Sequence, residues 1–145
     1  MPAELLFSAV TLAVVPAWLL LVLAPRWRHS AGLVSGVLVP VLLAATYAWL
    51  AFRYFPEADD SFTSLAGVRA AFGNDYILLA GWIHYLAFDL FVGSWEVRDS
   101  QRNGINHLVV VPCLILTFLL GPIGLLAYMV VRVSTGRRLD VDRTR

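Results

Sequence analysis

The segment from Tyr76 to Trp95 reads YILLAGWIHYLAFDLFVGSW, and it decides the fold. Its length matches the roughly 20 apolar residues that a helix needs to cross a bilayer. It nevertheless contains two ionisable side chains, His84 and Asp89. A charge at the centre of a bilayer costs on the order of 2.5–3.5 kcal/mol on insertion scales. Such groups usually face the interior of a helix bundle and often mark a functional site.

Three more apolar runs place the chain in a structural class. Of its 145 residues, 59% are hydrophobic and 14% are charged, whereas soluble domains are about 45–50% apolar and about 25% charged. We therefore expect an all-α integral membrane protein with four transmembrane helices in a bundle. The expected spans are residues 5–24, 32–53, 76–95 and 108–132 within a domain of residues 1–133, followed by a polar tail at 134–145. Pro40 and Pro122 predict bends inside two of the spans.

The connection between the second and third spans predicts a short helix. Phe62, Leu65, Val68 and Phe72 recur near helical spacing, and Ser61 is a candidate N-cap. This pattern fits a helix lying in the membrane interface. A surface helix packed on the bundle is the alternative interpretation.

Charge placement predicts the membrane and the orientation. Glu4 precedes the first run without a basic segment, and Pro25-Arg26 follows it in place of a cleavage site, so the first helix is expected to be retained. No organellar transit pattern is present, which favours a bacterial inner (cytoplasmic) membrane. Four spans would put both termini on one side, and the arginines near the C-terminus predict that this side is cytoplasmic.

Several function classes are excluded or disfavoured. The net charge is +1 and the basic residues lie at the ends of the runs, so no nucleic-acid partner is expected. A single cysteine, Cys113, and three histidines without HExxH spacing indicate neither a multi-cysteine metal site nor a metalloprotease. We expect no metal or other cofactor, although haem held through His84 or His107 stays open. One span with two polar groups does not make a transport path.

The polar residues of the third span suggest a site with two alternative roles. His84 and Asp89 are five positions apart and so point about 140° away from each other on a straight helix, whereas Tyr85 shares the face of Asp89. Asp89 is either an acid that handles a ligand or a hydrogen-bonded link to Tyr85 or Thr117. Beyond the span, Asp99 and His107 would meet the polar end of a lipid-like ligand, or belong to a solvated loop.

A longer pattern resembles a known family. It comprises the stretch GWIHYLAFDLFVG at 81–93, together with Asp99, His107, Pro112-Cys113, Thr117-Phe118 and Gly121-Pro122-Ile123-Gly124. This pattern is similar to the abscisic-acid-deficient-four-like family, most strongly between residues 79 and 132 and colinearly over most of the chain. Plant members are plastid membrane proteins that are required to make neoxanthin from violaxanthin, and they are regarded as neoxanthin synthases.

The resemblance implies a carotenoid or another apolar, lipid-like ligand in the membrane. Converting a 5,6-epoxide to an allenic alcohol needs an acid at the epoxide oxygen and a base at a neighbouring carbon, but no redox cofactor. We assign Asp89, kept neutral by desolvation, as the acid and His84 as the base. The expected substrate-binding residues are Tyr85, Phe88, Phe91, Asp99, His107, Thr117 and Phe118, whose rings would give flat walls. The alternative is a protein without catalytic activity that binds carotenoid or lipid, or that scaffolds pathway enzymes. A homo-oligomer or a pathway-enzyme partner is compatible with either role.

Overall fold

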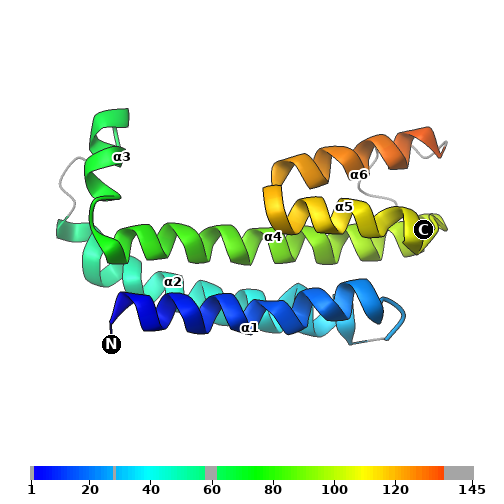
Figure 1. Cartoon of the computed structure of the whole chain (residues 1–145), viewed down its shortest axis with the longest axis horizontal. Coiled ribbons are helices and arrows are strands. Elements are labelled where there is room, and N and C mark those ends of the chain that lie inside the picture. Colours follow the sequence, from blue (N-terminus) through cyan, green and yellow to red (C-terminus); the bar gives the residue numbers. More distant parts are fainter. Residues whose placement is uncertain (1, 28, 58–61, 136–145) are drawn as a thin grey trace.

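Three long apolar helices form the body of the protein. The computed structural model describes residues 2–27, 29–57 and 62–135, and every regular element within these ranges is a helix. The helices long and apolar enough to cross a membrane are α1 (Ala3–Leu23), the continuous pair η1 (Ser30–Leu38) and α2 (Val39–Tyr54), and α4 (Asp75–Asn103). They lie side by side along one axis, with α1 and α2 packed against α4 (Figure 1). The all-helical class is confirmed, and these three candidate membrane-spanning helices overlap three of the four expected spans.

The central helix α4 extends beyond the expected span. The side chain of Asn74 caps its start by accepting a hydrogen bond from the Tyr76 amide at 2.9 Å, and Gly104 ends it with φ +66°. The helix therefore includes the segment from Glu96 to Asn103, which was predicted to lie outside the span at 76–95. The extension is explained by partners on other helices, because several of these polar side chains are buried.

The expected fourth span, 108–132, is corrected to a helical hairpin. Two shorter helices, α5 (His107–Leu120) and α6 (Pro122–Ser134), run in opposite directions (Figure 1). Gly121 lies between them with φ +50°, a conformation that L side chains rarely adopt. Pro122 starts α6, where its missing amide hydrogen is not needed. The 14 residues of α5 rise only about 21 Å, short of the roughly 30 Å hydrocarbon core.

The two arms of the hairpin approach each other closely. A Cβ atom placed on Gly124 would collide with the backbone nitrogen and the hydroxyl oxygen of Thr117. Only a glycine at this position lets α6 lie so near to α5. The bend expected at Pro122 is therefore a full reversal of the chain.

The helix expected between the second and third spans is α3 (Leu65–Ala71). Ser64 caps it, since its hydroxyl accepts a hydrogen bond from the Gly67 amide at 3.0 Å, whereas the expected cap Ser61 is outside the described residues. In Figure 1 this helix stands across the axis of the bundle. Leu65 is 77% exposed and Phe72 is 43% exposed. An exposed apolar surface on a helix that crosses the bundle axis favours the interfacial interpretation.

The second span begins as a π-helix. Nine residues, Ser30–Leu38, adopt this form directly before Pro40, where the sequence predicted a bend. Hydroxyl groups link the segment to its neighbours: Ser35 donates to the Ala17 carbonyl at 2.9 Å, and Ser94 of α4 donates to the Ala31 carbonyl at 3.0 Å. The Ser94 bond satisfies a carbonyl of the irregular segment itself, and the Ser35 bond ties the segment to α1.

The hairpin changes the expected orientation of the chain ends. Three long helices pass along the bundle, and the hairpin then returns to the end from which it started (Figure 1). The start of α1 and the end of α6 therefore lie at opposite ends of the bundle. This arrangement does not support the expectation that both ends face the cytoplasm.

Cysteine accessibility tests the three-span topology. In a Cys113→Ala background, we expect Pro2→Cys and Thr135→Cys to react with a membrane-impermeant maleimide from opposite sides of sealed vesicles, because three crossings separate them. Labelling is read by gel shift on right-side-out and inverted vesicles. Reaction of both cysteines from one side would contradict the hairpin and restore four spans.

Candidate functional site

A line of polar side chains on α4 faces the hairpin. Tyr85, Asp89, Glu96 and Asp99 follow at intervals of four, seven and three residues, which keeps them near one face of a helix. The line extends over about 21 Å at 1.5 Å per residue. Three carboxyl groups thus lie along one face of a helix that is long and apolar enough to cross a membrane, and their neighbours decide what each of them can do.

The carboxylate nearest the end of α4, Asp99, is neutralised by α6. Its Oδ2 atom accepts a hydrogen bond from the Tyr128 hydroxyl at 2.6 Å and lies 2.9 Å from Nε of Arg132. All three residues are buried, with 7%, 0% and 3% exposure respectively. A buried ion pair of this kind holds the hairpin on α4, because separating the two residues would leave two unpaired charges in an apolar environment.

Glu96 lies one turn away and is completely buried. Its Oε1 atom is 2.9 Å from the Thr117 hydroxyl, which is also 2.9 Å from the Cys113 carbonyl. A hydroxyl has one hydrogen, so its two acceptors compete unless the carboxyl group supplies a proton of its own. The other oxygen, Oε2, has no hydrogen-bond partner among the described residues. This acid is sealed between α4 and α5, out of reach of a ligand.

Asp89 differs because it lies at the tip of the hairpin and is only half-buried. A Cβ atom on Gly121 would come within 2.9 Å of Oδ1 and 3.1 Å of Oδ2, so the turn packs directly on the carboxyl group. Tyr85 interacts with Asp89, and its hydroxyl donates to the Phe118 carbonyl at 3.2 Å. Oδ2 of Asp89 has no hydrogen-bond partner among the described residues. Asp89 is therefore the least buried acid of the line, although its Oδ2 atom is itself buried.

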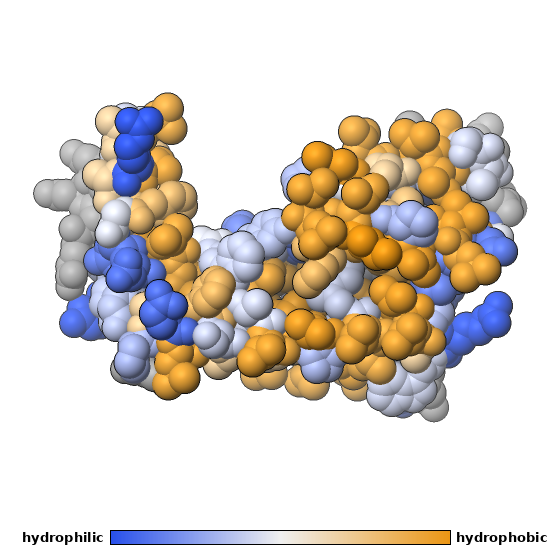
Figure 2. Space-filling view, viewed as in Figure 1, coloured by the Kyte–Doolittle hydropathy of each residue, from blue (hydrophilic) through white to orange (hydrophobic). Residues whose placement is uncertain are grey.

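Aromatic rings extend from this acid along α1 and α4. The ring centroids of Trp82 and Tyr85 are 5.3 Å apart, and those of Phe7 and Trp82 are 5.6 Å apart. At the hairpin, Phe118 meets Trp18 edge to face at 5.3 Å. We call these five residues the aromatic row. Figure 2 shows the molecule hollowed over the first half of α4, between α3 and the hairpin.

The structure does not bring the expected catalytic pair together. His84 is exposed and stacks on Phe88 at 4.6 Å, with Tyr47 at 5.7 Å, whereas Asp89 lies under the hairpin. Phe88 and Phe91 are also exposed, at 59% and 48%. His84, Phe88 and Phe91 therefore lie on the outer surface of the described bundle. The roles assigned to these residues stay predictions.

The second expected pair is also separated. Asp99 is occupied by Tyr128 and Arg132, and Nε2 of His107 lies 2.9 Å from the Val22 carbonyl. Thr117, expected to bind substrate, is fully buried against Glu96. Of the expected binding residues, Tyr85 and Phe118 are the ones that lie beside Asp89.

Three residues of the buried network were missed as site residues. Glu96 was placed in the loop, and neither Tyr128 nor Arg132 was singled out for chemistry. A signal existed, because Glu96 with Asp99 and Tyr128 with Arg132 are pairs at helical spacing. In one straight fourth span, however, Arg132 would lie at the far end of the bundle from Asp99. The pairs become complementary only when the chain reverses.

The fold and site define a small helical protein of the membrane-spanning type, in which a hairpin seals two acids and leaves a third half-buried. Residues 5–128 match the ABA DEFICIENT 4-like family, and the chain belongs to that family. It is 25% identical over 138 residues to "Protein ABA DEFICIENT 4, chloroplastic" of Arabidopsis thaliana. The match covers 90% of this chain and 61% of the plant protein. No solved structure matches.

Removing the Tyr128 hydroxyl tests the buried network. We expect Tyr128→Phe to lower the free energy of unfolding by about 1.5–3 kcal/mol, because a buried hydrogen bond to a charged group is lost. Tyr47→Phe is the matched control, since Tyr47 makes ring contacts with Phe55 and His84. Unfolding of the detergent-solubilised protein is followed by circular dichroism. Equal stability of the two variants would show that the network does not hold the hairpin.

Proposed function

We propose that the protein binds a carotenoid-like polyene in the membrane and isomerises an epoxide on its end ring. The observation that carries this proposal is the position of Asp89, a half-buried carboxyl group on a helix long and apolar enough to cross a membrane, against the hairpin turn and beside the aromatic row. Membership of the ABA DEFICIENT 4-like family supports the same class of ligand through the resemblance described above.

The aromatic row suits a long, flat, apolar ligand. Phe7, Trp82 and Phe118 are 40%, 36% and 38% exposed, so their faces and edges remain available for contact. Aromatic rings pack against flat π-systems through offset or edge contacts. A polyene of roughly bilayer length could follow the row from the end of the bundle to the hairpin turn.

The chemistry proposed for Asp89 is proton donation to the epoxide oxygen. A carboxyl group in an apolar environment favours its neutral form, which is the form that donates. As one C–O bond of the epoxide opens, the oxygen gains the proton and a neighbouring carbon loses another to a base. The product is an allenic alcohol with the same atoms as the substrate, so the step is an isomerisation.

The base is less closely constrained by the geometry. His84 was assigned this role, but it lies on a different face of α4 with Phe88 and Tyr47. A ligand ring held against Asp89 would have to extend around α4 to reach the imidazole. Tyr85 is the polar side chain beside the acid, and its contact with the Phe118 carbonyl suits it to orient the ring.

Replacing the acid separates binding from chemistry. We expect membranes with Asp89→Asn to retain the bound polyene but to lose at least a hundredfold of the product formed from violaxanthin, since general acid catalysis contributes about 10²–10⁴-fold. Product is quantified by chromatography, and bound pigment by the visible spectrum of the purified protein. Full activity of Asp89→Asn would contradict the proposed role.

His84→Ala is the matched comparison on the same helix. Nearly normal product from it would leave Asp89 as the acid and place the base elsewhere, whereas loss of product would restore the predicted pair. Bound pigment without product in the wild-type protein would favour the alternative role of binding or scaffolding. The bacterial inner membrane and any oligomeric or pathway partner stay predictions.

A further inference from the structure

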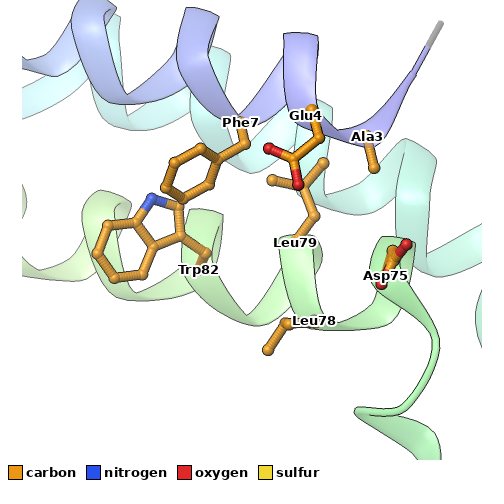
Figure 3. A pocket seen from close by; sticks show the side chains of 7 residues that line it. All are labelled: Ala3, Glu4, Phe7, Asp75, Leu78, Leu79 and Trp82. Atoms are coloured by element: carbon orange, nitrogen blue, oxygen red, sulfur yellow. The ribbon is translucent and has the colours of Figure 1, made fainter.

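A cavity opens between the first turns of α1 and α4, at the end of the bundle away from the hairpin. Its volume is about 300 Å³, and it is lined by Ala3, Glu4, Phe7, Asp75, Leu78, Leu79 and Trp82 (Figure 3). Its walls are mainly apolar, but two of the lining residues carry carboxylates. Both Glu4 and Asp75 are exposed. The site therefore combines an apolar interior with acceptor groups at the membrane boundary.

The cavity is continuous with the aromatic row. Phe7 and Trp82 line the cavity and face each other, and Trp82 also contacts Tyr85, which interacts with Asp89. A hydrogen bond of 3.1 Å from Nε1 of Trp82 to the Thr11 hydroxyl fixes the indole ring between these neighbours. The rings thus lead from the cavity to the acid at the hairpin turn.

The distance between the cavity and the acid fits the two ends of one ligand. Asp75 and Asp89 are fourteen positions apart on α4, or about 21 Å along the axis. A polyene that matches the roughly 30 Å hydrocarbon core is longer than this separation, so with one end at Asp89 its other end reaches at least as far as the first turn of α4. One end ring at Asp89 would place the other at the mouth of the cavity.

We infer that the cavity lined by Glu4, Asp75 and Trp82 holds the far end ring of the polyene and selects rings that bear a hydroxyl group. This inference rests on the proposed function. Carboxylates accept hydrogen bonds and cannot donate them when ionised, so they match an alcohol and give nothing to an unsubstituted hydrocarbon ring. The occupant is an apolar ring with one donor group, which is what the mixed lining fits.

The selectivity is measured with two polyenes that differ in ring hydroxyl groups. Zeaxanthin, which carries them, is expected to bind the detergent-solubilised wild-type protein about tenfold more tightly than β-carotene, which lacks them, because a hydrogen bond to a charged group discriminates at this level. Binding is followed by quenching of tryptophan fluorescence. In the double variant Glu4→Leu/Asp75→Leu, we expect the preference to disappear while the affinity for β-carotene stays near the wild-type value.

The retained affinity for β-carotene shows that the double variant is folded. Ser8→Leu, an exposed position on α1 that does not line the cavity, controls for the added apolar surface. Equal affinity for both polyenes in the wild type, or a preference that survives in the double variant, would overturn this inference. Binding of neither polyene to the wild type would overturn the proposed function itself.

Discussion

The ion pair between Asp99 and Arg132 is the interaction on which the rest of the structure depends. Its two charges lie in an apolar bundle, where removing one partner of such a pair typically costs about 3–5 kcal/mol. Arg132 can reach Asp99 only because the chain reverses at Gly121 and brings α6 back toward the end of α4. The ion pair and the reversal therefore require each other.

Local sequence predicted the long helices but not this reversal. Apolar runs of sufficient length identified α1, α2 and α4, and the cost of a charge in hydrocarbon identified Asp89. A proline inside a long apolar run, however, predicts a kink as readily as a break, so Pro122 alone could not distinguish them. The helical segment from Glu96 to Asn103 was missed for a related reason. A polar segment is predicted to be exposed to solvent when the sequence does not show its partners. Here a partner such as Tyr128 lies on a helix whose direction the sequence did not reveal.

The three acids on one face of α4 show how neighbours determine the role of a side chain. Asp99 has a cation and a phenol, and Glu96 has a hydroxyl group inside a sealed contact. Asp89 has the hairpin turn on one side and the aromatic row on another, and it is the only one of the three that is not fully buried. Residue type and spacing are the same kind of evidence for all three, so only the packing of α5 and α6 distinguishes the two buried acids from the half-buried one.

The length of the hairpin sets the point at which its turn packs on Asp89. The 14 residues of α5 run back along α4 from its C-terminal end, and the same number of positions separates Asn103 from Asp89. The turn therefore meets α4 about 21 Å from that end, near the middle of this 29-residue helix. A ligand dissolved in lipid would reach such a position without passing through water. A ligand dissolved in water would first have to enter the hydrocarbon. A hairpin shorter than a full span thus buries two acids and leaves the third half-buried at its turn.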